Sequence, residues 1–128
     1  MIWLKAVDGA PPYKAGMQRS LLFAARGIAI LGIGLISLFA LDAFEAEASL
    51  GDRLVGFLIH LTPSLALAGA LLMAWRRPGA GGALFIAAGL SPLLLTGNPL
   101  WTNLLLGAPF LIAGAAFATA SRLGGGRA

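Results

Sequence analysis

The only histidine of the chain, His60, lies inside an apolar run that extends from Leu54 to Trp75. Residues four apart share one face of a helix, so Gly56, His60 and Ser64 are expected to form a narrow stripe of small and polar groups. Such a stripe lets a neighbouring helix approach closely in lipid. An ionisable side chain at this depth is a functional-site hypothesis, because its exposure to hydrocarbon would be costly.

Pro63 lies three residues after His60. Proline has no amide N–H, so the carbonyl of Ile59 lacks its usual helical partner and stays free near the imidazole. We therefore expect Pro63 to kink this helix.

Polar side chains from four apolar segments are expected at the level of His60. We expect His60 to face the bundle interior, in a cluster that consists of Asp42, Glu45, His60, Ser64, Ser91 and Asn103. With a carboxylate of Asp42 or Glu45 as its partner, the imidazole could shuttle protons or bind a cation. The alternative is a structural hydrogen-bond network that fixes helix register, as Ser, Asn and His commonly do between helices in lipid.

The composition is that of a membrane protein. Of the 128 residues, 59% are hydrophobic and 11% charged, and the mean hydropathy is +0.88; a soluble domain of this length needs more polar surface. The net charge of +4 does not indicate a nucleic-acid partner, because the basic residues flank apolar segments instead of forming one patch. The expected partner is the lipid bilayer.

The apolar segments predict an all-α fold, an integral membrane bundle of four transmembrane helices. The expected spans cover residues 20–41, 54–75, 80–95 and 100–118, within a membrane domain of residues 19–120. Residues 1–18 are expected to be a leader that Pro11 and Pro12 break, and residues 121–128 a flexible tail.

A cleaved secretory signal is an alternative interpretation of the first span. A basic start, the apolar run Gly27–Leu41 and the small residues Ala46 and Ala48 resemble such a signal. We favour a retained span, because the leader is long and the carboxylates of Asp42 and Glu45 crowd the cleavage region.

Basic residues are distributed unequally between the two ends of the predicted helices. Eight fall on the side of the chain termini: Lys5, Lys14, Arg19, Arg26, Arg76, Arg77, Arg122 and Arg127. Only Arg53 falls on the other side, so we expect both termini to be cytoplasmic. Trp75 and Trp101, with Arg76 and Arg77, are the expected interface anchors.

Small residues recur at helical spacing in three segments. The stripes are Ala83, Ala87 and Ser91; Asn103, Gly107, Gly114 and Ala118; and, more weakly, Gly27, Gly34 and Ser37. They could form a homodimer surface or pack within one bundle. We favour packing within one bundle, because four short spans need these surfaces for each other.

Catalytic and cofactor motifs are not found. The chain has no cysteine and one histidine, which excludes thiolate metal sites, bis-histidine haem and three-histidine zinc. G-x-S-x-G, H-E-x-x-H and P-loop patterns do not occur. His60 and Ser64 on one helix do not reproduce a catalytic triad. We therefore expect neither an enzyme nor a cofactor or metal ion.

Several motifs together resemble a family of small prokaryotic four-helix membrane proteins of unknown function. They are Ser37–Phe44 with its aspartate, Gly56–Ser64 with H-x-x-P, and Ala74–Pro78 followed by Gly81, Gly82 and Phe85. The resemblance covers residues 19–99. It implies the four-span topology and a prokaryotic plasma membrane, directs attention to His60 and Asp42, and supplies no activity.

The expected function is that of a small structural or accessory membrane protein, such as a subunit of a larger membrane complex. The alternative is a small transporter or proton- or cation-handling protein that uses the cluster around His60. From Leu65 to Trp75 the second span offers no second polar layer, which counts against a conducting route.

The charge asymmetry yields a test of topology. Because the chain contains no cysteine, single cysteines can be introduced at Gly51 and Gly125 without background. In intact cells, an impermeant maleimide should label the cysteine at Gly51 and leave the one at Gly125 unlabelled until the membrane is opened. The reverse labelling would contradict the orientation.

Overall fold

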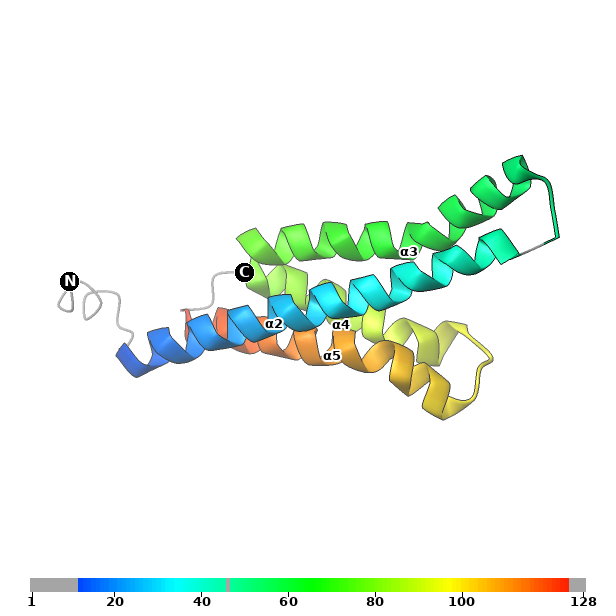
Figure 1. Cartoon of the computed structure of the whole chain (residues 1–128). Helices are drawn as coiled ribbons and strands as arrows, with labels where there is room; N and C mark the ends of the chain where they lie inside the picture. Colours follow the sequence, from blue (N-terminus) through cyan, green and yellow to red (C-terminus); the bar gives the residue numbers. More distant parts are fainter. Residues whose placement is uncertain (1–11, 46, 125–128) are drawn as a thin grey trace.

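The computed structural model of the chain describes residues 12–45 and 47–124, and the regular secondary structure of this part is entirely helical. Its elements are α2 (Pro12–Phe39), the short 3-10 helix η1 (Ala40–Glu45), α3 (Leu50–Arg76), α4 (Pro78–Leu95) and α5 (Leu100–Leu123) (Figure 1). Each of the four α-helices is long and apolar enough to cross a membrane. The predicted all-α class and the four apolar helices are therefore confirmed.

The helices extend beyond the predicted spans. Helix α2 begins at Pro12, so residues 12–18 are helical and are not part of a broken leader. Proline is well suited to the first helical position, where no N–H is needed. Helix α5 likewise continues to Leu123, into the predicted tail. Residues 1–11 and 125–128 of the predicted leader and tail lie outside the described residues.

The acidic connection between the first two helices is shorter than expected. Residues 42–53 separate the first two predicted spans, but residues 42–45 belong to η1 and residues 50–53 belong to α3. Ser49 caps α3, because its hydroxyl accepts a hydrogen bond from the backbone N–H of Asp52 at 3.2 Å.

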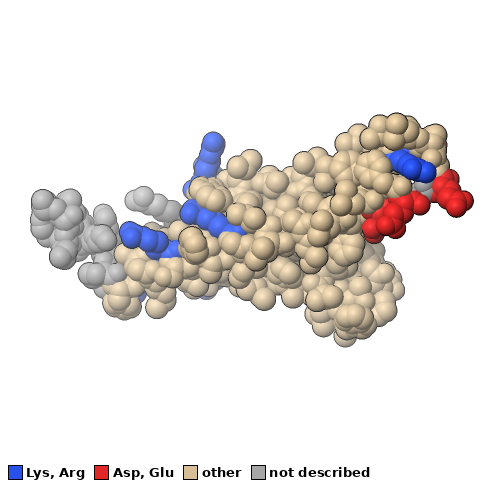
Figure 2. Space-filling model, in the orientation of Figure 1, with Lys and Arg blue, Asp and Glu red and all other residues tan. Residues whose placement is uncertain are grey.

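The four helices form a ring in which α5 packs between α2 and α4, while α3 packs against α4, α2 and η1. The start of α2 and the end of α5 lie at the same end of the bundle (Figure 1). Figure 2 shows lysine and arginine at this basic end and the acidic side chains at the opposite, acidic end.

The contact between α4 and α5 is a contact between glycine backbones. A Cβ atom added at Gly82 would lie 2.9 Å from the carbonyl oxygen of Gly114, and one added at Gly89 would lie 2.8 Å from that of Gly107. Two glycine pairs thus bring the antiparallel helices together without intervening side chains. The predicted stripe of the fourth segment is this packing face.

The favoured packing of the third segment's stripe within the bundle is wrong, because Ala83 and Ala87 are exposed. Helix α4 instead buries Gly82, Phe85 and Gly89. Phe85 is completely buried, and its ring stacks on Phe110 and Phe117 with centroids 6.1 and 5.8 Å apart.

Three helices contain an internal proline: Pro63 in α3, Pro92 in α4 and Pro109 in α5. Each proline removes one backbone hydrogen bond and favours a bend. Figure 1 shows α3 bending away from α4 and α5 toward the acidic end. The bundle is therefore closed at its basic end, whereas its two hairpins diverge at the acidic end.

The glycine contact yields a stability prediction. Gly107→Ala directs a methyl group at the backbone oxygen of Gly89, and we expect it to lower the free energy of unfolding in detergent by about 1–3 kcal/mol. Gly34→Ala is the matched control, because nothing lies within 4 Å of its added Cβ. It should leave stability unchanged or raise it by up to about 1 kcal/mol. Equal stabilities would contradict the assigned helix contact.

Candidate functional site

His60 is exposed and does not face the bundle interior, so the prediction of an inward-facing imidazole is wrong. Its Nδ1 lies 2.8 Å from the carbonyl oxygen of Gly56, one turn earlier in α3. Because a carbonyl only accepts, Nδ1 carries the proton, and in the neutral ring Nε2 is left as an acceptor.

The exposure of His60 follows from its position along α3. Ser64, one turn further and on the same face, is buried. His60 precedes Pro63, in the half of the helix that bends away from α4 and α5 (Figure 1). The second hairpin therefore leaves the imidazole uncovered.

Asp42 and Glu45 are exposed in η1, and neither pairs with His60 or with any other described residue. The contact between η1 and α3 is apolar, because Phe44 packs on Phe57 with their ring centroids 5.2 Å apart. The described residues also contain no group of three His, Asp or Glu side chains that could share a metal ion. The predicted carboxylate partner of His60 is thus absent from the described contacts.

Asn103 is buried and fastens the turn between α4 and α5. Its Oδ1 lies 2.7 Å from the hydroxyl of Thr96, and its Nδ2 donates to the carbonyl of Asn98 at 3.3 Å. Ser91 donates to the carbonyl of Ala88 in its own helix at 2.7 Å. These groups serve their own hairpin and do not reach α3.

Ser64 is only 3% exposed, and its hydroxyl has no hydrogen-bond partner among the described residues. It makes no hydrogen bond with Ser91 or Asn103. The structure therefore disperses the six residues of the predicted cluster over two hairpins.

A cation–π contact that the sequence did not predict joins the first two long helices near the basic end. The guanidinium carbon of Arg26 lies 4.2 Å from the ring centroid of Trp75. Arg76 and Arg77 follow at the exposed end of α3, and Trp101 lies in the first turn of α5 at the opposite end of the bundle. No local pattern signals a pair separated by this much sequence.

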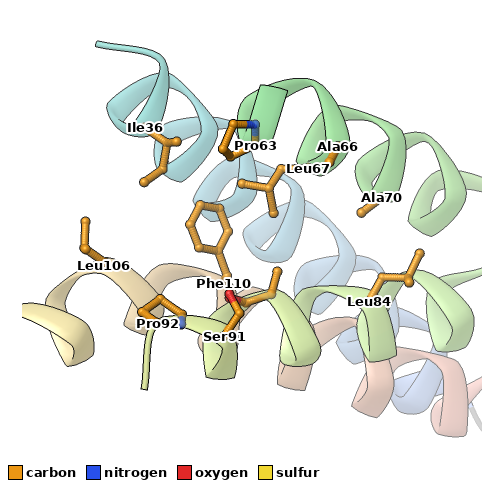
Figure 3. A pocket seen from close by; sticks show the side chains of 11 residues that line it. Ile36, Pro63, Ala66, Leu67, Ala70, Leu84, Ser91, Pro92, Leu106 and Phe110 are labelled. Atoms are coloured by element: carbon orange, nitrogen blue, oxygen red, sulfur yellow. The ribbon is translucent and has the colours of Figure 1, made fainter. Parts of the chain in front are cut away.

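An apolar cleft, also missed at the sequence level, lies where the hairpins begin to diverge (Figure 3). Its volume is about 420 Å³. Its walls are formed by Ile36, Pro63, Ala66, Leu67, Ala70, Leu84, Ala88, Ser91, Pro92, Leu106 and Phe110. The available sequence signal was the set of helix-internal prolines together with alanines on facing helices.

Fold and site together define a small four-helix protein whose helices are suited to crossing a membrane and whose polar groups mainly stabilise single helices and turns. The chain belongs to the family described as a domain of unknown function, DUF7670, which matches residues 14–123. This confirms the resemblance to an uncharacterised family. No curated protein and no solved structure matches the chain.

The different environments of Asn103 and His60 predict different mutational effects. Asn103→Ala removes a buried group together with its two hydrogen bonds in the turn between α4 and α5, so we expect a loss of about 1–3 kcal/mol in unfolding free energy. His60→Ala removes one exposed bond within a helix and should change it by less than about 0.5 kcal/mol. Denaturation in detergent measures both; a larger effect at His60 would contradict the assignment.

Proposed function

We propose that the chain is a multi-pass integral membrane protein of a prokaryotic plasma membrane. The support lies in its surface: many large apolar side chains are exposed, with Phe23 at 80% and Leu95 at 82%. Such a surface is unfavourable in water and favourable in hydrocarbon. The charged groups gather at the two ends of the bundle, where headgroups and water would meet them (Figure 2).

Both termini are proposed to be cytoplasmic. The first helix begins and the last one ends at the basic end, together with Arg76 and Arg77 at the end of α3. The acidic end carries Asp42, Glu45, Glu47 and Asp52 with a single arginine. An excess of basic residues marks the cytoplasmic side.

Within the membrane, the proposed role is that of a small structural or accessory protein, a subunit of a larger membrane complex, and not of an enzyme. The observation that carries this proposal is that polar side chains do not converge. Ser37, His60, Thr62, Ser91 and Thr119 each bond to a backbone carbonyl of their own helix. Handling of protons or cations requires polar side chains that converge on one site. The same observation therefore does not favour a small transporter or a proton- or cation-handling protein.

The half of α3 near the acidic end is exposed, which supports a contact with a partner protein. His60 is uncovered, and its Nε2 is not used in any contact with the described residues. An imidazole at membrane depth is costly without a partner. A neighbouring membrane protein that donates a hydrogen bond to Nε2 would reduce that cost.

Affinity isolation of the full chain from native membranes in a mild detergent tests the accessory role. We expect one or more membrane proteins at fixed stoichiometry, and we expect His60→Trp to reduce their recovery several-fold. Ala87→Trp, on the exposed face of α4, is the matched control and should leave recovery unchanged. Isolation of the chain without a stoichiometric partner would refute the accessory role.

A further inference from the structure

The cleft between the two hairpins has a defined shape and origin. Pro63 of α3 and Pro92 of α4 face it from opposite walls, and the ring of Phe110 lies between them (Figure 3). The small side chains of Ala66, Ala70 and Ala88 line its walls. Divergence of the helices at their prolines leaves this space open.

The side chains that line the cleft are almost wholly hydrocarbon. Ser91 provides the one side-chain polar group of the lining, and its hydroxyl hydrogen is directed to the carbonyl of Ala88 at 2.7 Å. A water molecule needs two to four polar partners to be held stably, and an ion needs more. The chemistry of the walls therefore selects an apolar occupant.

The size of the cleft distinguishes between apolar occupants. Its volume of about 420 Å³ lies in the range of about 300–1,000 Å³ that is usual for ligand sites. A helix with a diameter of about 10–12 Å and a pitch of 5.4 Å displaces roughly 400–600 Å³ in each turn. The cleft has room for at most about one turn of a partner helix, whereas one hydrocarbon chain can occupy it over a longer length.

We propose that this cleft binds one acyl chain of a bilayer lipid, which enters sideways between the hairpins while its headgroup stays outside. The site rests on the proposed membrane location, because only there does hydrocarbon surround its opening. It goes beyond the accessory role, since it assigns a ligand class to a part of the molecule that contains neither His60 nor a protein partner.

Photolabelling in nanodiscs tests the site with the full chain. The bilayer contains a phosphatidylglycerol with a diazirine in the middle of one acyl chain, and adducts are mapped by peptide mass spectrometry. We expect labelling of Leu67, Leu84 and Phe110 to exceed by several-fold that of Leu72 and Ile112, which are exposed outside the cleft.

A filling substitution makes the test specific. Ala66→Phe places a ring in the cleft at an exposed lining position. We expect several-fold less cleft labelling, because the ring fills the space that the acyl chain would occupy and the packing contacts of the chain with the walls are lost. Ala87→Phe, exposed and outside the lining, is the matched control and should leave labelling unchanged. If Ala66→Phe does not fold, Ala88→Leu narrows the same cleft and should reduce cleft labelling relative to the unchanged chain.

Several results would overturn the site. Equal labelling of cleft and outer residues would show bulk lipid only, and chemical cross-links between cleft residues of two copies would show a protein occupant. Cleft labelling unchanged by Ala66→Phe would also refute the site. Failure of the membrane location is distinguishable, because the chain would then be released from membranes by alkaline carbonate without detergent.

Discussion

The backbone contact between α4 and α5 is the constraint on which the rest of the bundle depends. It requires glycine at two levels, Gly82 against Gly114 and Gly89 against Gly107, because any side chain there would meet a backbone oxygen of the other helix. The resulting proximity stacks Phe85 on two phenylalanines of α5. Helix α2 then docks on α5 with Gly32 beneath Phe110, where an added Cβ would lie 2.9 Å from the ring. In a bilayer, where burial of apolar surface provides no drive for helix association, this close packing is the main source of cohesion.

The two ends of the bundle differ in how closely their helices pack. Each hairpin is fastened at its own tip, one by Phe44 on Phe57 and the other by Asn103 with Thr96. Among the described residues, no hydrogen bond or ring contact links the two tips. Between the tips and the glycine contacts, prolines remove backbone hydrogen bonds and let the helices bend apart. The cleft is the direct result of tight packing at one end and independent tips at the other.

The helices and the separation of charge could be predicted because both are local properties of the chain. The apolar runs set helix number and the flanking arginines set polarity, with no knowledge of packing. The packing faces of the helices were less predictable, because Ala83 and Ala87 suit a helix contact and a lipid-facing surface equally well. Only the close approach of the two backbones shows that α4 contacts α5 through its glycines. The pair of Arg26 and Trp75 depends on the crossing of two helices and has no sequence signal.

The predicted cluster around His60 failed for a more general reason. Residues at the same distance from the ends of their predicted spans lie at one level of the bundle only if the helices are packed together there. The two hairpins diverge toward the acidic end, where the cluster was expected (Figure 1). Within a helix, a hydroxyl or imidazole also has an acceptor one turn back, so its polar group can be satisfied without any neighbour. His60 takes this option through Nδ1 and the carbonyl of Gly56, which leaves Nε2 without a contact among the described residues. His60 is therefore not the centre of an internal site, and its unused Nε2 is the basis of the proposed contact with a partner protein.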